Sequence, residues 1–281
     1  YKYRIKNIDS RCEKKIVKNT VISVINQKGG VGKTTTVINL AASLSLFGKK
    51  CLVIDLDPQG NATTGLGISN NDTKKNVYHL LIGKIDFSEV ICKSKIENLN
   101  LIPSNVNLSG LEVETANDPN RAFILKENLK RNYDICSKYD YIFIDCPPSL
   151  SLLTIMALVS SDEILVPLQT EFFALEGITQ LMKTIERIKE KLNPKLILRG
   201  ILLTMFDKRN KLSSQVDKEA RDFFKSKVYD AVIPRNVRLS EAPSHGMPCV
   251  IYDTACVGSK AYKKFGQEFL EKEIKNIGSA A

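Results

Sequence analysis

One stretch near the start of the chain constrains the fold more than any other. Residues 21–25 form a short, mainly β-branched apolar run, and residues 26–36 read Asn-Gln-Lys-Gly-Gly-Val-Gly-Lys-Thr-Thr-Thr. From residue 37 onward, apolar residues recur at the spacing of one helix face. A strand, a glycine-rich loop and a helix in this order are typical of a phosphate-binding loop in an α/β protein.

The residue types in this loop suit a polyphosphate. Glycines allow backbone amides to turn inward around an anion, and the helix adds free N–H groups and the positive end of its dipole. Lys33 would contact the β- and γ-phosphates, and the Thr34 hydroxyl would bind Mg²⁺. The residues expected to bind the polyphosphate are Gly29, Gly30, Val31, Gly32, Lys33, Thr34 and Thr35.

The loop also departs from the usual pattern. Gln27 stands where a glycine is usual, and Lys28 adds a second lysine. The segment Lys-Gly-Gly-Val-Gly-Lys-Thr-Thr resembles the deviant Walker A loop of the ParA/MinD ATPases, and its surroundings resemble the ParA/Soj branch. This resemblance implies that Lys28 takes part in catalysis by crossing to the nucleotide of a second subunit in an ATP-bound homodimer. The alternative is that Lys28 is a solvated loop lysine.

Two other strands end in carboxylates. Asp55 and Asp57 follow the apolar run 51–54, and Asp145 ends the apolar run 141–144. Ligands of open α/β sheets bind at the carboxyl ends of strands. The resemblance implies that Asp57 orients or activates the attacking water, that Asp55 lies toward the Mg²⁺ hydration shell, and that Asp145, as in a Walker B strand, holds Mg²⁺ through water. Alternatively, Asp55 and Asp57 only shape the turn before Pro58.

Two loops in the C-terminal part extend the resemblance. Residues 203–209 and 233–246 are similar to the ParA/Soj pattern, the second almost residue for residue. The resemblance implies that these loops flank the adenine, with Met205, Phe206 and Pro234 in its pocket. Neither His79 nor His245 has a partner at useful spacing, so both are predicted to be structural.

Charge points to a polyanionic partner. Lysine and arginine number 41 against 31 aspartate and glutamate, a formal net charge of +10, which favours nucleic acid or an acidic membrane surface. No helix-turn-helix, zinc finger or aromatic platform is evident, so base-specific readout is not indicated. ParA/Soj proteins bind nonspecific double-stranded DNA as ATP dimers, through basic C-terminal residues. The candidates here are Arg209, Arg235, Arg238, Lys260 and Lys263, each of which could instead be a solvated surface cation.

A MinD-like role is the competing interpretation. MinD-like proteins dock to membranes through a C-terminal amphipathic helix, and Phe265, Phe269, Ile274 and Ile277 have near-helical spacing. The polar face of that segment mixes glutamate with lysine, whereas an interfacial helix is cation-rich. Packing against the body is therefore expected, with no stable membrane insertion. A nucleotide-switched positioning scaffold without essential DNA binding remains the alternative function.

Cysteine usage indicates the compartment. The seven cysteines contain no Cys-x-x-Cys pair, so no zinc or iron–sulfur site is predicted and a reducing cytoplasm is expected. The resemblance adds an association with the nucleoid. It further implies a chromosome or plasmid partitioning ATPase whose weak hydrolysis is stimulated by a ParB-type centromere-binding partner.

The remaining pattern predicts a doubly wound, mostly parallel sheet flanked by helices. The resemblance implies that this is a P-loop NTPase fold of the deviant Walker A type. Residues 1–20 are expected to form a basic N-terminal arm, and residues 21–281 a single ATPase domain with C-terminal helices. The expected strands after the first are 51–55, 99–103, 139–145, 163–167, 196–205 and 228–233. The expected helices after the first are 77–82, 121–132, 173–192 and 213–225.

Overall fold

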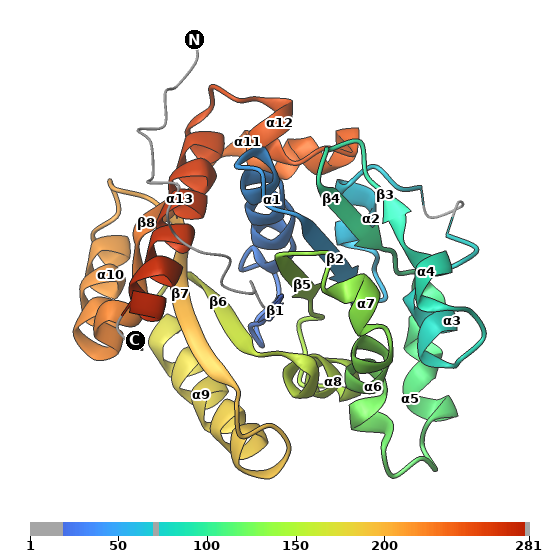
Figure 1. Cartoon of the computed structure of the whole chain (residues 1–281). Helices are drawn as coiled ribbons and strands as arrows, with labels where there is room; N and C mark the ends of the chain where they lie inside the picture. Colours follow the sequence, from blue (N-terminus) through green and yellow to red (C-terminus); the bar gives the residue numbers. More distant parts are fainter. Residues whose placement is uncertain (1–18, 70–72, 279–281) are drawn as a thin grey trace.

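The computed structural model describes residues 19–69 and 73–278, which form a sheet with helices on both faces (Figure 1). The predicted N-terminal arm lies outside the described residues except for Asn19 and Thr20. The single-domain boundary at residue 21 therefore stays a prediction.

Eight strands form one sheet in the order β3-β4-β2-β5-β1-β6-β7-β8. All neighbours run parallel except β3 and β4, which pair antiparallel at one edge. The predicted mostly parallel, doubly wound sheet is confirmed. The strands are β1 (Thr20–Val24), β2 (Cys51–Asp55), β3 (Cys92–Lys93), β4 (Leu99–Ile102), β5 (Tyr141–Asp145), β6 (Glu163–Gln169), β7 (Ile197–Phe206) and β8 (Val228–Pro234).

Both faces of the sheet are covered because its central strands are apolar on both sides. In β5, Ile142 and Ile144 belong to one hydrophobic core, whereas Tyr141 and Phe143 belong to the other. Successive side chains of a strand point to opposite faces, so a strand with no polar alternation has to be buried between two helix layers.

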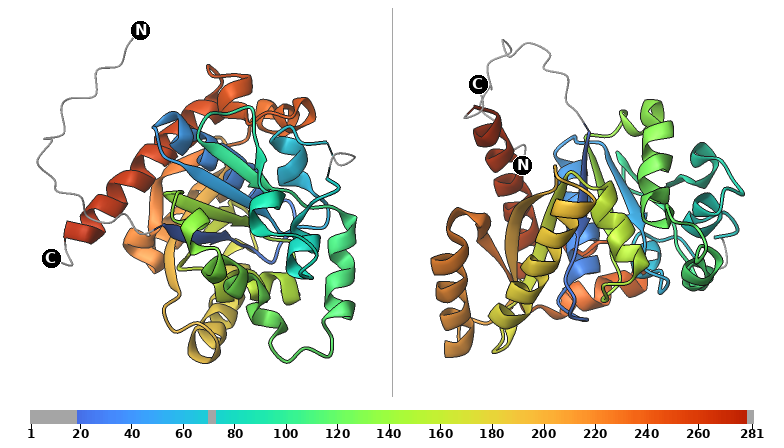
Figure 2. Two further views of the ribbon diagram at one scale, coloured as in Figure 1. Left: turned by 45° about the vertical axis from the view of Figure 1, so that its right-hand side comes forward. Right: turned by 90° about the horizontal axis from the view of Figure 1, so that it is seen from below.

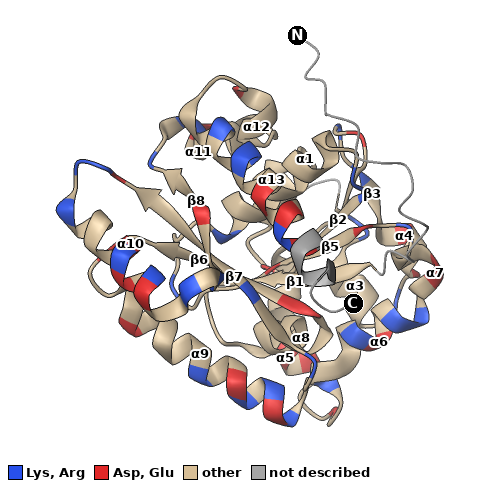
Figure 3. Ribbon diagram, turned by 60° about the vertical axis from the view of Figure 1, so that its left-hand side comes forward, with Lys and Arg blue, Asp and Glu red and all other residues tan. Residues whose placement is uncertain are grey.

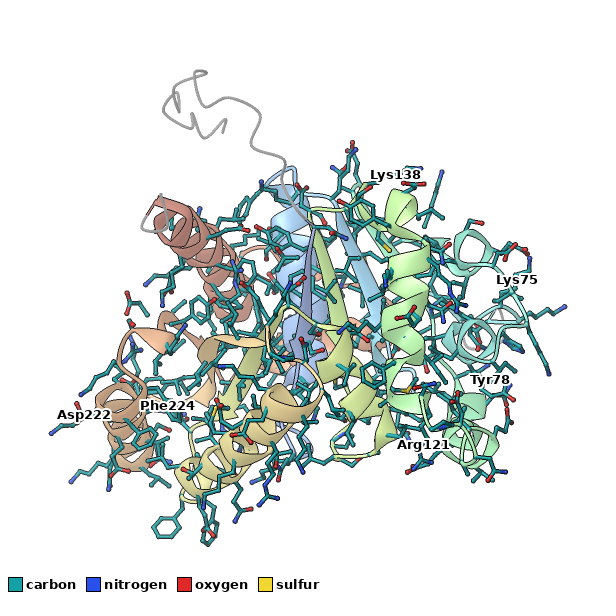
Figure 4. The ribbon with its side chains drawn as sticks, turned by 60° about the horizontal axis from the view of Figure 1, so that its bottom comes forward. Lys75, Tyr78, Arg121, Lys138, Asp222 and Phe224 are labelled. Carbon is teal, nitrogen blue, oxygen red and sulfur yellow. The ribbon has the colours of Figure 1, made fainter. Side chains whose placement is uncertain are left out.

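The first core packs against the helices α3 to α10, and the second against α1, α2 and α11 to α13. Figure 2 shows both layers, and in Figure 4 α10, marked by Asp222 and Phe224, and α3, marked by Tyr78, lie at opposite ends of the sheet. The helices are α1 (Lys33–Leu46), α2 (Asn61–Gly65), α3 (Val77–Leu81), α4 (Phe87–Val90), α5 (Leu111–Glu114), α6 (Ile124–Arg131), α7 (Tyr133–Cys136), α8 (Leu152–Ser160), α9 (Ala174–Lys191), α10 (Lys211–Phe224), α11 (Val237–Glu241), α12 (Cys249–Tyr252) and α13 (Val257–Gly278).

Most predicted elements are confirmed within two residues at each end. The predicted helix 121–132 instead begins as a 3-10 turn, Arg121–Phe123, before α6. The predicted strand 163–167 continues past Pro167 to Gln169. A proline fits there because β1 pairs with β6 only as far as Leu165, so the missing N–H of Pro167 interrupts no ladder with β1.

The C-terminal helix packs against the body, as its mixed charges predicted. Phe265 and Phe269 of α13 are fully buried, and the Phe269 ring contacts the rings of Tyr141 and Tyr229. Ile274 and Ile277 lie outside the residues whose side chains are described. Across residues 19–69 and 73–278, no helix combines the length and apolarity needed to cross a membrane.

Candidate active site

The three motif-bearing strands lie side by side. In the sheet, β5 lies between β2 and β1, with Asp145 in register with both Asp55 and Val24. Parallel strands end at a common edge of a sheet. The glycine-rich loop after β1 and the two carboxylates that end β2 and β5 therefore meet at that edge.

Asn26 fixes the start of the loop. Its side-chain amide donates to the Pro167 carbonyl at 2.8 Å, and its Oδ1 accepts the Lys28 amide at 3.0 Å. One side chain thus ties the loop to β6 and sets its first turn. Gly30 and Gly32 follow with φ of 75° and 89°, the left-handed region that side chains disfavour.

The loop leads directly into the first turn of α1. Gly32 is the residue before the helix and offers no side-chain cap, so amides at this N-terminus are available to an anion. Lys33 is only 6% exposed, and its Nζ donates to the Lys28 carbonyl at 3.1 Å. Burial lowers the pKa of Lys33, so bound phosphate would stabilise its charge.

Thr34 and Asp145 form the centre of the predicted metal site. The Thr34 hydroxyl donates to Oδ2 of Asp145 at 2.7 Å. The other oxygen, Oδ1, is buried and has no hydrogen-bond partner among the described residues. Burial and the nearby Asp55 carboxyl raise the pKa of Asp145. A hydroxyl beside an unpaired carboxylate oxygen is the hard-oxygen donor set that suits Mg²⁺.

Both carboxylate oxygens of Asp55 accept hydrogen bonds, in contrast to those of Asp145. Its Oδ2 accepts both the amide and the hydroxyl of Thr63, at 2.8 and 2.7 Å, and its Oδ1 accepts the Asp57 amide at 3.2 Å. Burial raises the pKa of Asp55 to about 6. These bonds make Asp55 an organiser of the loop after β2, while its predicted contact with the Mg²⁺ hydration shell stays a prediction.

Asp57 is held by one oxygen only. Its Oδ1 accepts the Gln59 amide at 2.9 Å, and the side chain is nearly buried. Within the described residues, no hydrogen bond involves its second carboxylate oxygen. Asp57, which is predicted to be catalytic, thus has an oriented carboxylate beside the phosphate loop.

Lys28 has a partner that the sequence did not reveal. Its Nζ forms an ion pair with Glu171, which lies between β6 and α9 and 143 residues along the chain. Both residues border a cavity of about 240 Å³ beside the loop. A contact over this separation leaves no local sequence signal, so no motif could have indicated Glu171.

A second cavity, of about 330 Å³, lies where the loop enters α1. Met205 and Pro234 border it together with Gly32 and Thr35 of the phosphate loop. Met205 has φ of 52°, unusual for a residue with a side chain. Phe206 is not among the lining residues, and its carbonyl accepts the Arg235 amide. Asn236, which the sequence did not indicate, borders the cavity and has a buried Oδ1 without a partner among the described residues.

The five candidate cations for DNA differ in their surroundings. Arg209 pairs with Asp207, and its hydrogen bonds lower the pKa of that carboxyl to about 2. Arg238 pairs with Glu241 and Asp253. Among the described residues, no ion pair involves Arg235, Lys260 or Lys263. Figure 3 shows basic segments on the loop before α10, near α11 and in the first half of α13.

Both histidines contact neighbouring side chains, and their structural role stays a prediction. His79 Nδ1 lies 3.1 Å from Oδ1 of Asn76, the residue that caps α3. The His245 ring stacks on Tyr252 with centroids 4.8 Å apart.

Known proteins resemble this chain over most of its length. A family model described as an AAA domain matches residues 19–198. The chain is 48% identical over 261 residues to the chromosome partitioning protein ParA of Caulobacter vibrioides, covering 93% of this chain and 97% of that protein. It is also 48% identical over 248 residues to the sporulation initiation inhibitor protein Soj of Bacillus subtilis, covering 88% and 97%.

One solved structure with the same fold holds a nucleotide analogue and magnesium. Cobyrinic acid a,c-diamide synthase from Mycobacterium smegmatis, with a bound ATP analog and magnesium, superposes with a TM-score of 0.78. The two chains are 33% identical, and the match covers 89% of this chain and 93% of that one. The doubly wound fold at this level of similarity accommodates a magnesium–nucleotide complex in that protein.

Proposed function

The chain belongs to the ParA/Soj family of chromosome partitioning ATPases, and on this basis we propose that ATP joins two copies into a dimer that binds nonspecific duplex DNA. A ParB-type centromere-binding protein would stimulate hydrolysis and so release the dimer. The observation that carries the proposal is the two-lysine loop, with Lys33 buried at the helix N-terminus and Lys28 half-exposed at its rim.

Phosphate binding follows from the loop geometry. The amides at the start of α1 would bind the phosphates, and Lys33 would exchange the Lys28 carbonyl for phosphate oxygens. Phosphoryl transfer depends on positioning and charge stabilisation more than on covalent chemistry. A lysine held by burial and one hydrogen bond is suited to both.

Thr34 and Asp145 would hold Mg²⁺ when the nucleotide binds. The fit rests on the unpaired Oδ1 of Asp145 beside the Thr34 hydroxyl. Bound Mg²⁺ neutralises the charge that develops on the phosphate oxygens. Asp145 would remain ionised in that state, because a nearby divalent cation counters the burial that raises its pKa.

Asp57 is the residue we assign to the attacking water. The Gln59 amide fixes the carboxylate plane through Oδ1, which leaves Oδ2 to accept a hydrogen bond from water. Asp55 acts indirectly, since its bond to the Asp57 amide holds the same turn.

Adenine would occupy the cavity bordered by Met205, Pro234 and Asn236. Its amino group can donate to the Asn236 Oδ1 that lacks a partner in the described chain. Phe206, which does not line the cavity, would contribute through its backbone position beside Arg235.

The dimer would present two basic surfaces together, and joining two weak sites raises the avidity for DNA. Cations that form no ion pair among the described residues can neutralise phosphates without first leaving a partner, so we rank Arg235, Lys260 and Lys263 above Arg209 and Arg238. Binding of this kind would place the protein on the nucleoid. We do not propose the MinD-like alternative, because Phe265 and Phe269 face the core rather than a membrane.

Light scattering combined with an ATPase assay tests the proposal. With ATP and Mg²⁺, the wild type should approach the mass of a dimer, and with ADP that of a monomer. Lys33→Ala should remain monomeric in ATP, whereas Asp57→Ala should form the dimer without turnover. An ATP-dependent dimer of Lys33→Ala would contradict the role of Lys33, and normal turnover of Asp57→Ala would remove Asp57 from the mechanism.

A further inference from the structure

A second group of reactive side chains lies away from the phosphate loop, where α12 meets α13. Cys249 is the first residue of α12, and Cys256 directly precedes α13. Their Sγ atoms are 3.4 Å apart. A disulfide bond is about 2.05 Å long, so the two sulfurs need to approach by roughly 1.4 Å to form one.

Ser259 connects the two thiols. Its hydroxyl donates to the Cys249 carbonyl at 2.7 Å, and the same oxygen lies 3.3 Å from each sulfur. Its amide donates to Sγ of Cys256 at 3.4 Å, and the Lys260 amide donates to the Cys256 carbonyl. Cys256 thus caps α13 through its sulfur, and amides at a helix N-terminus stabilise a thiolate there.

The pKa values of the two thiols are shifted in opposite directions. Burial raises the pKa of Cys249 to about 11. Burial also opposes ionisation of Cys256, but hydrogen bonds with Ser259, Cys249 and Gly258 outweigh it and lower the pKa. Cys256 is partly exposed and Cys249 is fully buried. A small oxidant can therefore reach the more acidic thiol first.

The other described cysteines lack these features. Burial raises the pKa of Cys51, Cys92, Cys136 and Cys146, and none of them has a second sulfur in contact. The described residues also contain no group of three histidine, cysteine or carboxylate side chains that could hold a metal. The pair is therefore suited to thiol chemistry rather than to metal binding.

We propose that Cys249 and Cys256 form a reactive dithiol that hydroperoxides oxidise to an intramolecular disulfide. The Cys256 thiolate attacks one peroxide oxygen, the O–O bond breaks, and the other oxygen leaves as an alcohol or water after taking a proton. The resulting Cys256 sulfenic acid is attacked by the Cys249 sulfur, and hydroxide leaves and takes the Cys249 proton as water. Two thiols lose two electrons in total, and one peroxide gains them.

Peptide mapping of the full chain tests this inference. No lysine or arginine lies between Leu239 and Lys260, so trypsin releases both cysteines in one peptide, residues 239–260. Reduced protein is treated with hydrogen peroxide until half of Cys92, the reference thiol, has reacted, and free thiols are then alkylated. The proposal predicts that the fraction of the 239–260 peptide that has lost two hydrogen atoms exceeds the reacted fraction of Cys92, which is one half. Dithiothreitol should restore the two hydrogen atoms. An equal or smaller fraction would overturn it.

Two variants separate the roles of the sulfurs. In Cys249→Ser, Cys256 should stop at the sulfenic acid, which dimedone captures. In Cys256→Ser, Cys249 should react no faster than Cys92. Faster oxidation of Cys249 in that variant would refute the assignment of Cys256 as the attacking thiol. Because neither cysteine belongs to the phosphate loop or has a role in the proposed partitioning function, the outcome of this test is independent of that function.

Discussion

Lys28 and Lys33 flank the same glycine loop but have opposite surroundings. Lys33 is buried and donates to a backbone carbonyl, whereas the Lys28 side chain is 54% exposed and pairs with Glu171. The buried lysine is placed to act within its own subunit. The exposed one has to leave Glu171 before it can reach a second subunit.

This competition makes Glu171→Gln a test of the Lys28 assignment. An exposed ion pair is worth about 0.2–1 kcal/mol, and a dimer has to release two of them. The ATP-dependent dimer should therefore tighten by about 2- to 30-fold in its dissociation constant, measured by sedimentation.

The matched controls are Glu176→Gln, an exposed glutamate of the same cavity, and Glu171→Gln in a Lys28→Ala background. Neither should tighten the dimer relative to its own parent. Equal tightening in the Lys28→Ala background would show that Glu171 acts through another group.

The raised pKa of Asp55 leads us to expect that the stability of the nucleotide-free protein depends on pH. Its folded pKa of about 6 exceeds the ordinary value of 3.8, so between these values the folded state retains a proton that the unfolded state has lost. Stability should therefore fall as pH rises from about 4 to 6, by about 1.4 kcal/mol per pH unit for this group.

The free energy of unfolding of wild type and Asp55→Asn, measured across that range, isolates the effect. Asparagine does not titrate, so the difference between the two curves should change between pH 4 and 6 and remain flat above it. Parallel curves would contradict the assignment.

At the scale of elements, α13 is a structural helix. Arg199 of β7 places its guanidinium 3.7 Å from the centre of the Phe269 ring, which is fully buried between the sheet and the helix. Removing such a ring leaves a cavity that the packed surroundings cannot fill.

Phe269→Ala should accordingly lower the free energy of unfolding by about 3–5 kcal/mol, measured by urea denaturation. Phe223→Ala, at a ring of α10 that is 69% exposed, should change it by no more than about 0.5 kcal/mol. A small effect at Phe269 would mean that the helix detaches readily, as a membrane-docking helix must.

The sequence predicts those helices and strands whose hydrophobic pattern is evident within the segment itself. Strands β1, β2 and β5 are continuous apolar runs with turn signals after them, and α9 and α10 have strong helical periodicity. The helix α8 escaped prediction because Leu152–Ser160 is buried over most of its surface and shows little polar alternation. The two-residue strand β3 exists only through its pairing with β4.

The same distinction applies to the site. Lys33, Thr34, Asp57 and Asp145 lie in motifs, and the fold brings them to one sheet edge. The bonds from Thr63 to Asp55 and from Glu171 to Lys28, and the pair Cys249–Cys256, depend on tertiary approach. Sequence spacing carries no information on such contacts.

At the scale of the whole molecule, the account requires nucleotide, dimer and DNA to be coupled. The candidate DNA-binding cations occupy several elements (Figure 3), and the full sequence carries a net charge of +10, which favours a polyanionic partner. Binding that neutralises phosphates releases counterions from the DNA, and this release becomes less favourable as the salt concentration rises, so the affinity falls. The salt dependence therefore reports how many cations contact DNA.

The most direct test measures binding to a nonspecific duplex with ATP, ADP or no nucleotide across a salt series, for wild type, Arg235→Ala, Arg238→Ala and Lys191→Ala. Lys191 is an exposed lysine at the C-terminus of α9, away from the candidate cations. The account predicts tight binding with ATP alone. Arg235→Ala should weaken it and reduce the salt slope by about 1 per subunit, Arg238→Ala should weaken it less, and Lys191→Ala should leave it unchanged. DNA binding that ignores the nucleotide, or an ATP dimer that ignores DNA, would contradict the central claim.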